Sequence, residues 1–243
     1  MARYQAVLAY DGTLFHGFQR QAAERTVQGE VEEALHRVGW TGGSILAAGR
    51  TDAGVHASGQ VIAFDLAWAH TPAALLQALN ANLPSDVAVR QVRVAGEDFH
   101  PRYHARARRY QYRIFSDSTR NPLRERFAWR VWPAPDLDRL NQAAAQLLGE
   151  HDFRAFGSPP KPGGVTVRRV QAATWQHERD ELIFEIEANA FLYHMVRRIV
   201  QLQVDIGQGK LPPASVRQYL NGETGPVKGL APPHGLTLVG VRY

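Results

Sequence analysis

Ala48-Gly49-Arg50-Thr51-Asp52-Ala53-Gly54-Val55-His56-Ala57-Ser58-Gly59-Gln60 is a glycine-rich segment with an apolar run on either side, at 44–47 and 61–64. This pattern predicts two strands joined by a tight connection. Arg50 stands two residues before Asp52, the single carboxylate of the connection. Residues two apart on an extended backbone point to the same side, where a cation favours the ionised carboxylate. From these residues alone, Asp52 is either a reactive group or the support of an ordinary turn.

The composition predicts a globular, cytoplasmic protein that does not enter a membrane. The chain has 243 residues, of which 44% are hydrophobic and 21% charged. No apolar run approaches the roughly 18 residues that a membrane span needs. The N-terminus begins with a strand-like alternation and lacks the apolar region of a signal peptide. Cysteine is absent, which excludes disulfides, thiolate metal sites and cysteine nucleophiles.

The histidines and glycines predict neither a metal nor a cofactor. None of the ten histidines has the spacing of two zinc ligands on one helix face. His100 and His104 are four residues apart, but Pro101 argues against a helix there. The run 207–210, Gly-Gln-Gly-Lys, lacks both the first glycine and the hydroxyl residue of a phosphate loop.

The charge distribution indicates a partner that carries phosphates. The net charge is +5, and arginine supplies 25 of the 28 cations. Residues 102–130 contain nine arginines against Asp117 and Glu125. Arginine binds phosphate oxygens in a bidentate manner, so this window is typical of a nucleic-acid contact. In the alternating run 108–115, Tyr110 and Tyr112 share one face and either stack on a base or pack in the core.

Helices and strands are expected to alternate in both halves of the chain. Strands are expected near 3–10, on both sides of the glycine-rich segment within 44–66, and near 87–94, 108–115, 166–176, 182–188 and 236–241, with helices near 26–38, 71–83, 136–148, 190–205 and 213–220. The repeated βαβ spacing of a doubly wound sheet is missing. We therefore expect an α+β fold of mostly antiparallel sheet with helices packed on it. The seam is expected near 101–122, between an N-terminal half, 1–105, and a C-terminal half, 106–243.

The segment 49–56, Gly-Arg-Thr-Asp-Ala-Gly-Val-His, resembles the signature of the TruA family of tRNA pseudouridine synthases. Further segments follow in the family's order over nearly the full length. They are Tyr10-Asp11-Gly12, Gly17-Phe18-Gln19-Arg20-Gln21, Asn80-Ala81-Asn82-Leu83-Pro84, Ala107-Arg108-Arg109-Tyr110, Gly149-Glu150-His151-Asp152-Phe153, Asn189-Ala190-Phe191, Val196-Arg197-Arg198 and Pro232-Pro233-His234-Gly235-Leu236.

The resemblance implies an isomerase of the pseudouridine synthase fold, with a basic active-site cleft between two α/β halves. Its reaction would convert uridine to pseudouridine at positions 38, 39 and 40, in the anticodon stem-loop of tRNA. The N1–C1′ bond breaks, the uracil turns, and C5 joins C1′, without metal or cofactor. The family is a homodimer whose tRNA touches both subunits. The alternative is a catalytically inactive tRNA-binding or chaperone protein that retains the fold.

The resemblance also assigns roles to residues. Asp52 takes the place of the essential carboxylate, which attacks C1′, adds to C6 of the base, or removes the C2′ proton. Tyr110 would stack on the target base, and Leu236 would line the uracil pocket. Arg50 would occupy or steady the stem after the uridine leaves, and Arg197 would pair with Asp52. The residues expected to bind tRNA phosphates are Arg102, Arg106, Arg108 and Arg109.

Overall fold

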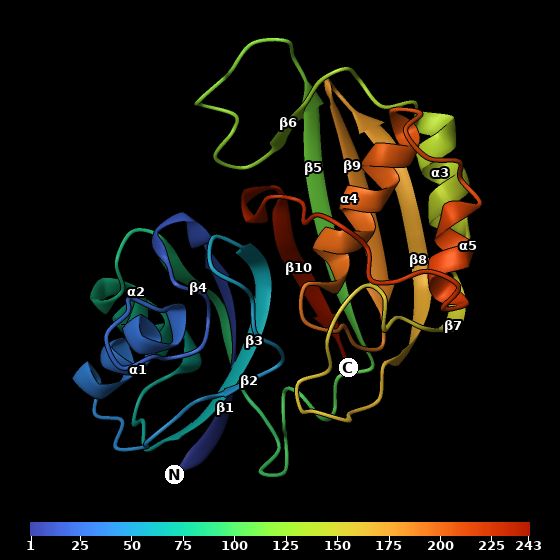
Figure 1. Cartoon of the computed structure of the whole chain (residues 1–243). Helices are drawn as coiled ribbons and strands as arrows, with labels where there is room; N and C mark the ends of the chain where they lie inside the picture. Colours follow the sequence, from blue (N-terminus) through green and yellow to red (C-terminus); the bar gives the residue numbers. More distant parts are fainter. The chain divides into compact units, whose positions relative to one another are not determined.

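The structure, a computed structural model, describes residues 1–243 and divides into two compact units (Figure 1). The first unit consists of residues 1–106 and 237–243, and the second of residues 107–236. The expected halves, 1–105 and 106–243, put residues 106 and 237–243 in the second half, whereas these residues group with the first unit. Segment 237–243 groups with the first unit because its strand hydrogen-bonds to a strand of that unit, a pairing that no local pattern in the sequence indicates.

The first unit is an antiparallel sheet with helices on one face (Figure 1). Its strands follow the order β4-β1-β3-β10, and β2 pairs with β3. Only β10 runs parallel to its neighbour β3. The elements are β1 (Ala2–Tyr10), the 3-10 helix η1 (Gly12–Leu14), α1 (Val27–Arg37), β2 (Leu46–Ala47), β3 (His56–Leu66), α2 (Pro72–Asn82), β4 (Val87–Val94) and β10 (Leu236–Arg242).

Both helices of the first unit begin where their capping residues predict. The side chain of Thr26 accepts a hydrogen bond from the Gly29 backbone N–H, and Thr71 does the same for Ala74. Val27, Val31 and Leu35 of α1 are buried, as their spacing predicts. The expected helices near 26–38 and 71–83 are confirmed.

The second unit is also a mostly antiparallel sheet, in the order β5-β9-β8-β7, with the short β6 added parallel to β5. Its helices lie on one face of this sheet (Figure 1). The elements are β5 (Ala107–Ser116), β6 (Trp129–Val131), α3 (Leu137–Ala145), β7 (Gly149–Asp152), β8 (Val167–Glu178), β9 (Glu181–Ala188), α4 (Met195–Gly207), α5 (Ser215–Leu220) and the 3-10 helix η2 (Pro233–Gly235). The α+β class is confirmed, whereas β6 and β7 are too short to be evident from the sequence.

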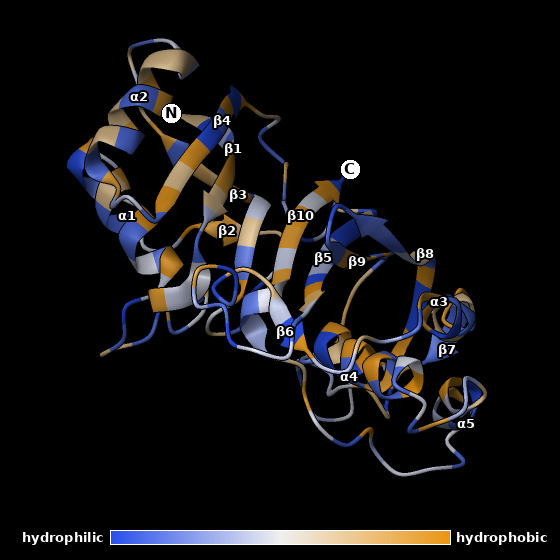
Figure 2. Cartoon of the chain, turned by 90° about the horizontal axis from the view of Figure 1, so that it is seen from above, coloured by the Kyte–Doolittle hydropathy of each residue, from blue (hydrophilic) through white to orange (hydrophobic).

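Helix α4 starts later than the sequence predicts. The expected start was near Ala190, but His194 has a φ of 66°, in the left-handed region, and the helix begins at Met195. Residues 189–194 lie outside the helix, so Phe191 belongs to a loop. No residue of α4 is fully exposed, and Figure 2 shows hydrophobic bands along it. Helix α4 is thus the buried centre of the second unit.

The structure contains no helix long and apolar enough to cross a membrane. It also contains no group of three or more histidine, aspartate or glutamate side chains arranged to hold a metal ion.

Candidate functional site

The Asp52 loop, residues 48–55, connects β2 to β3 as the apolar runs predict. Thr51 is buried, Asp52 is half-buried and Arg50 is exposed. The backbone N–H of Val55 donates to the carbonyl of Asp52 at 3.1 Å and closes a turn directly after the carboxylate residue. Asp52 therefore sits where the chain reverses, between a buried residue and a closed turn.

Segment 10–18 holds the first part of the Asp52 loop. The Tyr10 hydroxyl and Thr51 Oγ1 are hydrogen-bonded at 2.8 Å, and both residues are buried. The backbone N–H of Phe18 donates to the Thr51 carbonyl at 3.0 Å. Gly17 has a φ of 92°, and a Cβ there would lie 3.0 Å from the same carbonyl oxygen, so the two chains approach closely only because this residue is glycine. Thr51 is thus fixed by both its side chain and its backbone.

His56 joins the far end of the loop to the same segment. The Gly12 backbone N–H donates to His56 Nδ1 at 3.0 Å, and Asp11 Oδ1 lies 3.2 Å from that nitrogen. Both contacts of Nδ1 therefore come from segment 10–18, one from a backbone N–H and one from a carboxylate oxygen. The His56 side chain is buried, so these contacts are shielded from solvent.

The Tyr10 hydroxyl that is hydrogen-bonded to Thr51 is uncharged. Burial raises the pKa of Tyr10 to about 12, although its hydrogen bonds to Thr51 and Gln60 oppose that shift. Gln60 Nε2 also donates to the Gly49 carbonyl at 2.9 Å, at the start of the Asp52 loop. The start of the loop is therefore fastened through uncharged groups.

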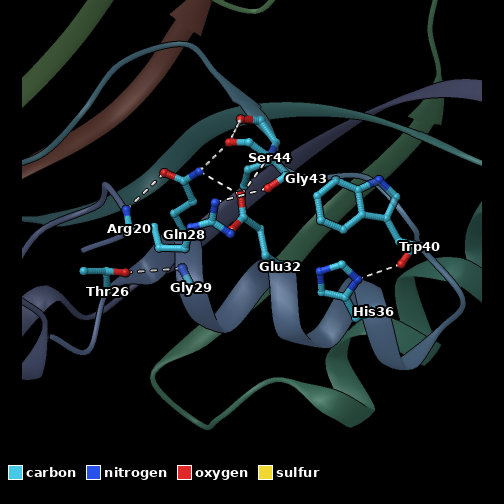
Figure 3. A network of polar contacts seen from close by, with 10 residues as sticks. Arg20, Thr26, Gln28, Gly29, Glu32, His36, Trp40, Gly43 and Ser44 are labelled. Atoms are coloured by element: carbon cyan, nitrogen blue, oxygen red, sulfur yellow. Dashed lines mark hydrogen bonds and ion pairs between the residues drawn. The ribbon is translucent and has the colours of Figure 1, made fainter. Parts of the chain in front are cut away.

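A buried carboxylate on α1 supports the chain that leads into β2 (Figure 3). Glu32 accepts hydrogen bonds from the backbone N–H of Ile45 at 3.0 Å and from Gln28 Nε2 at 2.8 Å. Its other oxygen pairs with Arg20 Nη1 at 2.7 Å, and Arg20 Nη2 donates to the carbonyl of Gly43. A buried carboxylate with a cation and several donors is satisfied and rigidifies its surroundings. These contacts fix α1, Arg20 and residues 43–45 relative to each other.

In the second unit, Tyr110 and Tyr112 lie on the same face of β5, as alternation predicts. Tyr112 is fully buried and donates its hydroxyl to the Pro232 carbonyl at 2.7 Å. Core packing is therefore the correct alternative for Tyr112. Tyr110 is 9% exposed, and its ring meets Phe191 edge-on with centroids 5.0 Å apart. Tyr110 thus has an aromatic neighbour from the loop that replaces the expected start of α4.

Arg197 is a buried cation on α4. Its Nε donates to the Ala231 carbonyl at 2.7 Å, and the Ala231 N–H donates back to the Arg197 carbonyl. Burial raises the pKa of Tyr112 well above its ordinary value, and the Arg197 charge acts in the opposite direction. Leu236 is buried and follows Pro232 closely in the chain. The second unit therefore brings Tyr112, Arg197 and segment 231–236 together, whereas the expected pairing of Arg197 with Asp52 stays a prediction.

The arginines of the basic window have different surroundings. Several form ion pairs with carboxylates, of which Asp180 and Glu181 lie far away in sequence: Arg113 with Glu181, Arg124 with Asp180 and Glu181, and Arg120 and Arg130 with Glu125. Of the four expected tRNA contacts, Arg108 donates to the Asn189 carbonyl and Arg109 lies 3.6 Å from Glu185. Arg102 and Arg106 are exposed. The charge of the window is thus partly compensated by acids that a local count does not include.

Comparison with known proteins identifies the family. A family model described as tRNA pseudouridine synthase matches residues 6–104 and 143–243. The chain belongs to this family. Residues 105–142, which contain Tyr110, lie outside that match.

The similarity to curated members of the family extends over the whole chain. The chain is 40% identical to tRNA pseudouridine synthase A of Coxiella burnetii, with 100% of this chain and 94% of the relative covered. It is 39% identical to the protein of the same name from Streptococcus equi subsp. equi, with 99% of the relative covered. For that of Limosilactobacillus fermentum the identity is 37% and the coverage 96%.

Among solved structures, the chain is similar to one in the crystal structure of a Cbf5-Nop10-Gar1 complex, at 12% identity. The match covers 83% of this chain and 45% of the other, and a TM-score of 0.37 is too low to support a conclusion.

Sequence reasoning missed the residues that hold Asp52 in place. Tyr10, Gly12 and Gly17 lie in two of the segments that resemble the family, but no pattern assigns them a partner in the Asp52 loop. The available signal is a tyrosine at the end of the first strand, with glycines shortly after it. Their partners are about 40 residues away, which only the fold reveals.

Proposed function

We propose that this chain is an isomerase that converts uridine to pseudouridine in tRNA. The observation that carries the proposal is the similarity to proteins named tRNA pseudouridine synthase A, at 37–40% identity over the whole chain. Asp52 stands in a loop whose two ends are both fastened to segment 10–18. A firmly held carboxylate is what nucleophilic or general-base chemistry on a ribose or base requires.

Asp52 is proposed as the catalytic carboxylate. It attacks C1′, adds to C6 of the uracil, or removes the C2′ proton. Each route ends with the N1–C1′ bond replaced by C5–C1′, while N1 gains a proton and C5 loses one. Reactant and product are isomers, so the balance needs neither an oxidant nor a second substrate.

Tyr110 and Leu236 are proposed to hold the uracil. A base inside a stem must leave its stack before reaction, at a cost of a few kcal/mol. Stacking a base on an aromatic ring contributes about 1–3 kcal/mol, which offsets much of that cost. The edge-on contact with Phe191 sets the orientation of the Tyr110 ring for this role. Arg50, which is exposed, is proposed to steady the stem once the uridine has left it.

We further propose that the target uridines are those at positions 38, 39 and 40 of the anticodon stem-loop. We further propose that the chain acts in the cytoplasm as a homodimer, with Arg197 paired to Asp52. Arg102, Arg106, Arg108 and Arg109 would bind tRNA phosphates.

Incubation with unmodified tRNA tests the function. Chemical mapping of pseudouridine after reaction is expected to show product at positions 38, 39 or 40 and no product at other uridines. Three transcripts, each with uridine at only one of these positions, resolve the sites. Product elsewhere in the tRNA would contradict the site assignment while keeping the activity.

The alternative, an inactive tRNA-binding protein, predicts binding without any product. Measuring tRNA binding and pseudouridine on the same sample separates the two. Binding alone does not require the carboxylate of Asp52, so the intact loop favours the enzyme.

A further inference from the structure

Two side-chain contacts, one on each side of Asp52, tie the Asp52 loop and the start of β3 to residues 10–12. On the N-terminal side, Thr51 Oγ1 bonds to the Tyr10 hydroxyl at 2.8 Å. On the C-terminal side, His56 Nδ1 accepts the Gly12 N–H at 3.0 Å. Their partners, Tyr10 at the end of β1 and Gly12 at the start of η1, are only two residues apart, so a single short segment holds both ends of the loop.

These contacts are buried, which makes their loss costly. Tyr10, Thr51 and His56 are 5%, 7% and 4% exposed, respectively. A buried polar group that loses its partner retains its desolvation penalty, so the loop would relax to satisfy it elsewhere. None of the three side chains is assigned to the substrate.

We propose that Tyr10 and His56 are positioning residues that aim the Asp52 carboxylate at the uridine. This inference rests on the proposed function. A displacement of a reactive group by about 1 Å can cost on the order of a hundredfold in rate, even when substrate binding is kept. The Tyr10–Thr51 hydrogen bond is the first clamp, and the Gly12–His56 hydrogen bond is the second. Both clamps act through the backbone of residues 51–56 and do not touch the substrate.

The test measures the single-turnover rate at saturating tRNA and, separately, the Kd for tRNA. Tyr10→Phe and Thr51→Val each remove one hydroxyl of the first clamp, and His56→Leu removes the acceptor of the second. We expect each to lower the rate by about tenfold to a hundredfold. The Kd for tRNA is expected to stay within about twofold, because the clamps do not contact tRNA.

Conservative variants separate positioning from simple loss of folding. Thr51→Ser keeps the hydroxyl, and His56→Asn keeps an acceptor near the place of Nδ1, so both are expected to recover most of the lost rate. Tyr243→Phe is the matched control. Its hydroxyl donates to the Pro101 carbonyl at 3.0 Å in the same unit, away from the Asp52 loop, and its removal should leave the rate unchanged.

The outcomes are distinguishable from those of the proposed function. Absence of product with the unmodified chain contradicts the function itself. An unchanged single-turnover rate in Tyr10→Phe and His56→Leu contradicts the positioning role and leaves the proposed function intact. Equal rates for His56→Asn and His56→Leu, or a rate loss matched by weaker tRNA binding, overturn the proposal as well. If Tyr10→Phe does not fold, the Thr51→Val and Thr51→Ser pair tests the same hydrogen bond from the loop side.

Discussion

Gly12 is the position at which one added methyl group should damage the first unit most. An ideal Cβ on Gly12 would lie 2.1 Å from the carbonyl oxygen of Val55 and 2.5 Å from its carbon. Real contacts of this kind are longer than 3 Å, and both atoms belong to the backbone. Neither segment can relieve the overlap by rotating a side chain. We therefore expect Gly12→Ala to push segment 10–14 away from the Asp52 loop.

The magnitude follows from two contributions. Overpacking of a close contact costs about 1–3 kcal/mol. Loss of the Gly12 N–H hydrogen bond to His56 adds about 1 kcal/mol. The free energy of unfolding should thus fall by about 2–4 kcal/mol, which for a chain of this size lowers the Tm by about 5–15 °C.

Gly49→Ala is the matched control, because no heavy atom lies within 4 Å of a Cβ built there. Alanine at such a site also reduces the entropy of the unfolded chain, so we expect a change of less than about 1 kcal/mol, in the stabilising direction. Thermal and urea unfolding followed by circular dichroism measure both variants. Equal stability of Gly12→Ala and Gly49→Ala would refute the close approach of residues 12 and 55.

Two further predictions concern the second unit and the tRNA contact. The pKa of Asp152 is lowered to about 2, chiefly by its hydrogen bond from Arg154, so its stabilising effect is complete above the unfolded pKa near 4 and is lost as the pH falls through about 2. Because Asp152 is 22% exposed, Asp152→Asn should lower the free energy of unfolding by only about 1 kcal/mol at pH 7, and urea titrations should show this deficit vanish between pH 4 and 2; a constant deficit contradicts the ion pair. Arg106→Ala should reduce the salt dependence of tRNA binding by about one phosphate contact, whereas Arg113→Ala should change it less, since Glu181 holds that guanidinium at 2.8 Å. Equal salt slopes for both variants, measured by filter binding, would show that an ion pair with a carboxylate does not prevent an arginine from binding a tRNA phosphate.

Local patterns predicted most helices and strands because capping residues and alternation act over a few positions. Thr26 and Thr71 begin their helices as expected, and the two strands around the Asp52 loop are present. Helix α4 begins later than the pattern predicts because His194 adopts a left-handed backbone conformation. That conformation usually marks a glycine, and the sequence has none at this position. The parallel pairing of 237–238 with 56–57 joins segments 181 residues apart, and no local pattern indicates it.

Some features of the candidate site are likewise evident from the sequence, and others only from the fold. The residues around Asp52 stand out by composition, and the resemblance to the family supplied their roles. The compensation of Arg113 and Arg124 by Asp180 and Glu181 depends on the pairing of β5 with β9 and the turn after β8. A count of charges along the sequence cannot detect that pairing.

The role of Asp52 is the central claim, and Asp52→Asn tests it most directly. This variant keeps the size of the side chain but replaces the carboxylate with a neutral amide. With unmodified tRNA in excess of the Kd, we expect no pseudouridine from Asp52→Asn, while its Kd for tRNA and its Tm stay close to those of the unmodified chain. Turnover by Asp52→Asn equal to that of the unmodified chain would contradict a catalytic role for Asp52.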